Sequence, residues 1–273
     1  MSAKTFRTVG RRTQAAAAFA GLVALFAGIA IFSGPGNQAG AANGTEGGAS
    51  AAPGRAIYLG AASAKRIPLC PERCSGLAVV SGIQAKAGGV ASSYRVPFVG
   101  KVTRWRIKLG KPNASQVNFF KSHFGAQPQA AIGILAPKEV NGKLVYKLRR
   151  RTQMKNLTAF MGKTATFNLP QPVKVNEGDL ISLIVPTWAP ALSTPPACEE
   201  VNGAVKNEGV CDKFNENNSW LASRTRNQCF NADGSLKPIN MRTSQAQMKV
   251  NTLQAYNCRF NGALLYGVRV ESR

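Results

Sequence analysis

The chain has 273 residues, with 35 Lys and Arg against 12 Asp and Glu, one His, six Cys and a formal net charge of +23. A single His and so few carboxylates argue against enzymes that need a His base, several His metal ligands or clustered acids. The excess of positive charge favours encounters with polyanions.

Residues 1–41 have the features of an export segment. Four basic residues precede an uncharged apolar run over residues 15–32, and Ala39-Gly40-Ala41 supplies the small residues of a signal-peptidase site. We expect cleavage before Ala42. An uncleaved membrane anchor is the alternative, because the run of 18 residues approaches the ~20 that span a bilayer. Both outcomes predict an extracellular or cell-surface protein that contacts the membrane only through residues 15–32, if at all.

Residues 42–56 are rich in Gly, Ala and Ser and should form a flexible linker. Residues 57–273 are then one domain of about 215 residues. The first 42 residues contain four Lys or Arg and no acid, so a charge of +19 remains on the rest.

The six cysteines all follow the export segment, which predicts disulfides. Six cysteines allow about 15 connectivities, and we predict three local pairs. These pairs are Cys70-Cys74, Cys198-Cys211 and Cys229-Cys258. A zinc site at Cys70 and Cys74 is the alternative for the shortest pair, but oxidation outside the cell removes the thiolates, and the one His offers few further ligands. We therefore expect no metal and no cofactor.

Strand patterns dominate from Ile57 onward. In Lys101–Leu109, apolar residues alternate with Arg104, Arg106 and Lys108, which indicates a strand with one buried face and one basic face. Asn141-Gly142 predicts a tight hairpin turn, and Glu177-Gly178-Asp179 predicts a second turn. The other strands are expected at residues 131–135, 144–151, 164–169, 172–175, 180–185, 220–223, 248–257 and 263–270.

One short helix is expected after Ser115, which we predict as its N-cap, and it should end at Gly125. Many short strands with a single short helix predict an all-β fold, an antiparallel jelly-roll-like sandwich preceded by the N-terminal apolar export segment. A parallel α/β fold would need helices between the strands.

Several segments together carry a family resemblance. They are residues 97–105, 119–125, 131–135, 178–179, 185–192 and 219–224. On these segments the chain resembles a group of uncharacterised exported β-sandwich proteins of soil actinobacteria, from Cys70 to its end. The resemblance implies export and implies no activity. The turn at residues 177–179 before a late apolar strand is also similar to jelly-roll modules that bind carbohydrate.

Two kinds of binding residue stand out. Trp188 lies between Pro186 and Pro190 in a stiff loop that could present its ring to a sugar, and packing of that ring is the alternative. Two basic rows would form one phosphate- or carboxylate-binding face if their strands are neighbours. The rows are Arg104, Arg106 and Lys108, and Lys147, Arg149 and Arg151. A solvated basic face without a ligand is the alternative.

Catalytic patterns are scarce. His123 falls in the last turn of the expected helix, where a cation suits the helix dipole, and no serine lies in a nucleophile elbow. Asn231–Ser235 matches half of a calcium loop and is better explained as a turn. We assign no catalytic residue.

We therefore expect a non-catalytic module that binds anionic or carbohydrate polymers of the cell envelope or its surroundings. The alternatives are a polysaccharide-active enzyme, which would carry two carboxylates about 5 to 10 Å apart in a cleft, and an inert structural envelope protein. We do not expect nucleic acid as a partner, because exposed aromatic residues do not alternate with the basic ones.

Overall fold

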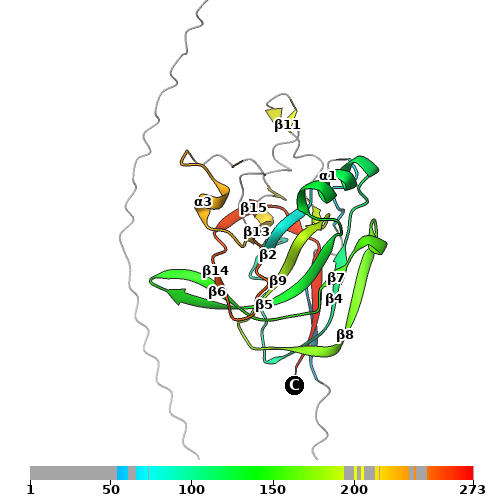
Figure 1. Cartoon of the computed structure of the whole chain (residues 1–273). Coiled ribbons are helices and arrows are strands. Elements are labelled where there is room, and N and C mark those ends of the chain that lie inside the picture. Colours follow the sequence, from blue (N-terminus) through cyan, green and yellow to red (C-terminus); the bar gives the residue numbers. More distant parts are fainter. Residues whose placement is uncertain are drawn as a thin grey trace, which may run out of the picture. The chain divides into compact units, whose positions relative to one another are not determined.

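The computed structural model shows a chain made mainly of antiparallel strands (Figure 1). The structure describes residues 54–60, 66–72, 74–193, 200–201, 204–205, 213–214, 216–233, 237 and 245–272. These residues belong to the second of the chain's two units, Ser50–Arg273. The predicted export segment, all of the predicted linker before residue 54, and Cys198 and Cys211 lie outside the described residues.

The small sheet has four antiparallel strands in the order β1-β17-β4-β8. Their bounds are β1 Ala56–Leu59, β17 Tyr266–Ser272, β4 Gly100–Lys108 and β8 Thr164–Val175. β8 merges the two strands that we expected at residues 164–169 and 172–175. It accommodates Pro170 and Pro172 because the register with β4 is interrupted there, and because β8 is an edge strand.

The large sheet runs in the order β14-β6-β5-β9-β2-β13-β15, with β3 paired to β2 and β7 paired to β5. Its strands span the following residues: β14 Leu253–Gln254, β6 Lys143–Arg151, β5 Gln129–Val140, β9 Leu180–Ala189, β2 Leu77–Ala87, β13 Ser219–Ala222, β15 Cys258–Asn261, β3 Val90–Ala91 and β7 Lys155–Asn156. Two short pairs complete the strands, β10 (Leu192–Ser193) with β16 (Ala263–Leu264), and β11 (Glu200–Val201) with β12 (Ala204–Val205). An all-β, antiparallel fold is thereby confirmed.

One buried apolar core is shared by the two sheets. Trp105 and Ile107 of β4 belong to the same cluster as Leu183 and Val185 of β9. Burying each such side chain stabilises the fold by roughly 1.5–3 kcal/mol. Because β4 places these residues in the core, the basic residues that alternate with them lie on the other side of the small sheet.

The opposite face of the large sheet is also apolar. Leu183 packs in the shared core, while its neighbour Ile184 packs in a second cluster with Leu135, Leu148 and Tyr256. Tyr256 comes from residues 245–257, which cover part of this face. We expected a strand over residues 248–257, and this prediction was wrong apart from the two residues of β14. Asn251 has φ +68° and Thr252 N bonds back to Lys249 O at 3.3 Å, so the chain turns there.

The predicted helix exists as α1 (Ala114–Phe124), but its predicted cap was wrong. Asn113, not Ser115, is the N-cap. The Asn113 Oδ1 accepts a hydrogen bond from Gln116 N at 3.0 Å, and Gln116 Oε1 accepts one from Asn113 N at 2.9 Å. This reciprocal capping box satisfies two backbone donors, whereas Ser115 only donates its hydroxyl to Asn113. A 3₁₀ turn, η2 (Thr158–Phe160), follows β7.

The hairpin turn at Asn141-Gly142 is confirmed. Both residues have positive φ, +50° and +70°, which is the geometry that makes Asn-Gly favourable between two paired strands. Val140 pairs with Lys143 across the turn.

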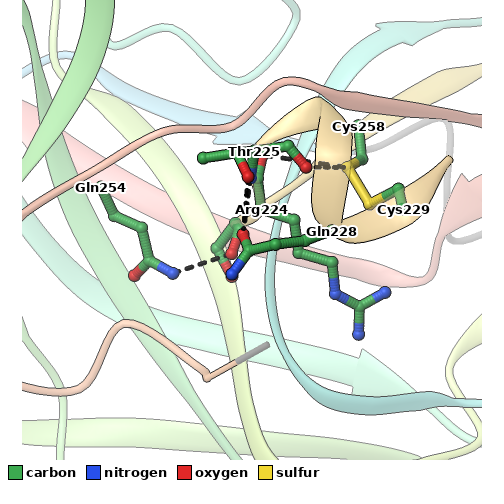
Figure 2. Close-up of a disulfide and its surroundings, with 7 residues drawn as sticks. Arg224, Thr225, Gln228, Cys229, Gln254 and Cys258 are labelled. Atoms are coloured by element: carbon green, nitrogen blue, oxygen red, sulfur yellow. Dashed lines mark hydrogen bonds between the residues drawn. A yellow bond between two sulfur atoms is a disulfide. The ribbon is translucent and has the colours of Figure 1, made fainter. Parts of the chain in front are cut away.

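Two of the predicted disulfides are confirmed, Cys70-Cys74 and Cys229-Cys258. The second links α3 (Arg226–Cys229) to β15, as Figure 2 shows. Thr225 caps α3 through Gln228, whose Oε1 accepts a hydrogen bond from Thr225 N at 2.8 Å. Among the described cysteines none is free.

Candidate functional site

Trp188 does not present its ring to solvent. It is the ninth residue of β9, only 1% exposed, and it stacks on Phe120 of α1 with ring centroids 5.0 Å apart. Its Nε1 donates a hydrogen bond to Gly125 O at 3.0 Å, at the end of the same helix. Trp188 therefore fastens α1 to the large sheet, and of our two interpretations the packed one fits the structure.

The two predicted basic rows do not form one face. Arg104, Arg106 and Lys108 lie on β4 of the small sheet, while Lys147, Arg149 and Arg151 lie on β6 of the large sheet. The condition that their strands be neighbours is not met, because the chain passes from the small sheet to the large one between β4 and β5. Each row must be judged separately.

Two residues of the β6 row, Arg149 and Arg151, make contacts within the protein. Arg149 Nη1 lies 3.5 Å from Asp179 Oδ1, and the Asp179 side chain is 2% exposed. Arg151 Nε donates a hydrogen bond to Met248 O at 3.1 Å. These side chains hold the covering segment and the turn before β9 against the sheet, which is a structural role.

Two residues of the β4 row, Arg104 and Arg106, line a depression on the outer face of the small sheet. Strand register places Tyr58, Arg269, Arg104 and Asn168 in one line across β1, β17, β4 and β8. The next line on the same face holds Gly267, Arg106 and Thr166. The depression has a volume of about 340 Å³. It is lined by Tyr58, Arg104, Trp105, Arg106, Thr166, Gly267 and Arg269.

Neighbouring side chains hold the three arginines in place. Arg104 Nε donates a hydrogen bond to Asn168 Oδ1 at 2.6 Å. Arg269 Nε lies 3.3 Å from Glu271 Oε1, which also accepts a hydrogen bond from Thr103 Oγ1 at 3.1 Å. The guanidinium carbon of Arg106 lies 5.9 Å from the centre of the Tyr58 ring, within reach of a cation–π contact.

The charges of this face do not cancel. Glu271 is the acid that pairs with one of its three arginines, and Lys108 adds a fourth cation farther along β4. Guanidinium groups bind carboxylate and phosphate oxygens in pairs of parallel hydrogen bonds. The depression therefore offers several fork-shaped donors to one anionic group or to neighbouring ones.

Gly267 lies between Arg106 and the end of β1. A Cβ at this position would lie 2.8 Å from Leu59 O and 3.5 Å from Arg106 Nε, so a side chain would collide with the backbone of β1. The glycine lets β1 and β17 approach closely and leaves the depression open at this point.

Our sequence reasoning found two members of the depression, Arg104 and Arg106, and missed the others. Tyr58 is 48% exposed and lies on the four-residue strand β1. This strand is too short for an alternation of apolar and polar residues to mark Tyr58 as a binding residue. Arg269 lies in β17, where it alternates with the buried Val268 and Val270. That alternation was the available signal for a basic residue on the outer face.

A second, larger hollow of about 590 Å³ lies along residues 245–254, with Val79 and Pro186. Its central amide is already used: Gln247 Nε2 donates to Tyr146 O at 3.0 Å, and Gln247 Oε1 accepts from Tyr256 Oη at 2.9 Å. These bonds attach the covering segment to the large sheet, so this hollow is not our candidate site.

Three tyrosines have a pKa above the ordinary value of a phenol. Burial raises the pKa of Tyr146, and it raises the pKa of Tyr256 and Tyr266 well above the usual value. All three rings pack in the two clusters described above, away from the lining of the depression. They contribute to stability, and no ligand role follows from them.

His123 lies at the exposed end of α1, with Nδ1 2.8 Å from Phe119 O. Within the described residues, no group of three or more His, Cys, Asp or Glu could hold a metal ion. Among the helices in those same residues, none is long and apolar enough to cross a membrane.

No protein-family model, no curated protein and no solved structure is significantly similar to this chain.

Proposed function

We propose that this protein is an exported, non-catalytic module that binds anionic polymers through the outer face of its small sheet. The observation that carries the proposal is the depression in which Arg104, Arg106 and Arg269 line one hollow with no carboxylate among its described lining residues. Positive charge on an extended face raises the encounter rate with a polyanion, and the arginine forks then bind its charged groups.

The strand order supports a jelly-roll architecture for the module. The eight main strands in chain order are β1, β2, β4, β5, β6, β8, β9 and β17, and they can be lettered B to I. The small sheet then has the order B-I-D-G, and the core of the large sheet has the order F-E-H-C. This alternation of successive strands between two antiparallel sheets is the pattern of a double Greek key.

Export is supported by two features. The N-terminal sequence has the charges, apolar run and small residues of a signal peptide or anchor. The two disulfides are compatible with an extracellular location, where they persist. An anionic polymer of the envelope or its surroundings is then the partner that the charge favours.

The enzyme alternative receives no support from the depression. A glycosidase needs two carboxylates about 5 to 10 Å apart. Glu271, the acid beside this face, already accepts contacts from Arg269 and Thr103. The described lining of the depression adds no second acid.

The test is binding of the purified protein to soluble and wall-derived polyanions across a salt series. We expect Arg104→Gln/Arg106→Gln to weaken binding about tenfold or more, and to lower the slope of log affinity against log salt by about two. Lys138→Gln/Lys143→Gln removes the same charge from the exposed ends of β5 and β6, and serves as the matched control. Equal losses in both variants would leave only a nonspecific charge effect, and no binding by the parent protein would reject the proposed function.

A further inference from the structure

Tyr58 is a feature that anion binding alone does not require. Nearly half of its side chain, 48%, is exposed, and it lines a depression whose other main groups are cations. A tyrosine ring supplies an apolar face with a polar end, which suits the apolar face of a pyranose. The ring lies next to Arg269 in the strand register and close to Arg106, and Arg104 lines the same depression. This combination suits a ligand that has both a ring and an anionic group.

Polar groups lie on the opposite rim, on β8. Thr166 pairs with Arg106, and Asn168 pairs with Arg104. Asn168 uses its side-chain oxygen to accept the hydrogen bond from Arg104, so its NH₂ group remains a donor. A hydroxyl and an amide at this rim match the hydroxyl groups of a sugar, which donate and accept hydrogen bonds.

The dimensions fit one or two sugar units. Neighbouring strands lie about 4.8 Å apart and alternate residues on one strand about 6.7 Å apart, so the three arginines start from a small area of the sheet. The volume of about 340 Å³ lies at the small end of ligand sites, which occupy roughly 300–1,000 Å³. One carboxylate can therefore reach two guanidinium groups while its own ring remains beside Tyr58.

We propose that the depression binds a polysaccharide containing uronic acid, with a pyranose ring on Tyr58 and its carboxylate between Arg104, Arg106 and Arg269. This proposal rests on the proposed function and names its ligand class. A flexible phosphodiester polymer without rings would leave Tyr58 and the rim donors unused. A single-stranded nucleic acid would stack successive bases on several rings, and Tyr58 is the one exposed aromatic residue in the described lining.

The test measures the affinity of the protein, at about 0.15 M salt, for polymers that carry sugar rings, anionic groups or both. The probes are polygalacturonate, polyglutamate, carboxyl-reduced polygalacturonate, polyphosphate and single-stranded DNA, and binding is measured by calorimetry. We expect polygalacturonate to bind about tenfold more tightly than polyglutamate at equal carboxylate concentration. The carboxyl-reduced polymer should lose most of the affinity.

Variants of Tyr58 measure the contribution of its aromatic ring to binding, separately from that of the arginines. Tyr58→Leu should weaken polygalacturonate binding about tenfold and polyglutamate binding by less than about threefold, because polyglutamate loses only the support that the ring gives to Arg106. Tyr58→Phe, which keeps the ring, should retain the parent affinity for both polymers. Thermal melting of each variant checks that the fold is intact. Equal binding of both polymers with no effect of Tyr58→Leu would overturn this inference and leave the proposed function standing. Tighter binding of polyphosphate or DNA would also overturn it, and no binding of any polyanion would reject both.

Discussion

Trp188 gives the sharpest stability prediction. Trp188→Ala removes a ring that is 1% exposed and stacks on Phe120, and it deletes the hydrogen bond to Gly125 O. Truncating a buried Trp to Ala costs about 3–5 kcal/mol, because the transfer energy of the ring is lost and a cavity remains. Against a total stability of about 5–15 kcal/mol this is a large loss, equivalent to a melting temperature lower by roughly 10 °C.

The control is Trp188→Phe, which keeps an aromatic ring against Phe120 and leaves Gly125 O without its donor. We expect it to cost about 1–2 kcal/mol, mainly through the lost hydrogen bond. Urea unfolding followed by far-UV circular dichroism measures both variants. If Trp188→Ala left the unfolding midpoint unchanged and abolished polymer binding, the ring would be a ligand contact and our structural reasoning would be wrong.

Two further predictions concern buried polar groups. Arg149→Gln should destabilise the fold more than Asp179→Asn, because it leaves a 2% exposed carboxylate without its cation, whereas Asp179→Asn leaves a partly hydrated Arg149. Urea midpoints compare the two, and the opposite ranking would contradict the assignment of that ion pair. Burial raises the pKa of Tyr256 and Tyr266, so the folded protein holds these phenol protons more tightly than the unfolded chain, where the pKa is about 10. Stability should therefore be independent of these groups below about pH 10 and fall as the pH rises above it, which urea midpoints between about pH 9 and 11 measure. Tyr256→Phe should lessen the fall, and a midpoint that rose over this range would refute the reasoning.

Local patterns were sufficient for some strands and insufficient for others. β4 was predicted because its apolar and basic residues alternate, so its burial can be deduced from the sequence. β2, a central strand of the large sheet, was missed because it contains buried polar residues. Gln84 is 1% exposed, and its amide bonds to Ser219 O at 3.2 Å and Gly262 O at 3.0 Å. These partners lie more than 130 positions away in the sequence, so nothing near Gln84 indicates that it is buried.

The site was predicted only in part, for a related reason. Alternation identified which way Arg104 and Arg106 point, but it cannot say which strand lies beside β4. One of its two neighbours is β17, near the end of the chain, which brings Arg269 and Gly267 to the depression. The β6 row also has basic residues at alternate positions, yet Asp179 in the turn before β9 contacts Arg149, and Met248 contacts Arg151. Which basic row is available to a ligand is therefore decided by contacts between segments far apart in the sequence.

Charge repulsion distinguishes the depression from an ordinary solvated face. Dispersing the positive charge of the chain over its surface would lower self-repulsion, whereas the small sheet places Arg104, Arg106 and Arg269 in adjacent register. Glu271 offsets the charge of Arg269, and the cation–π contact with Tyr58 favours Arg106 without neutralising it. A carboxylate bound between the arginines would offset much of the remaining repulsion. The same feature that weakens the free fold at this point would thus strengthen the complex, which is the reason to look for the ligand here and not along β6.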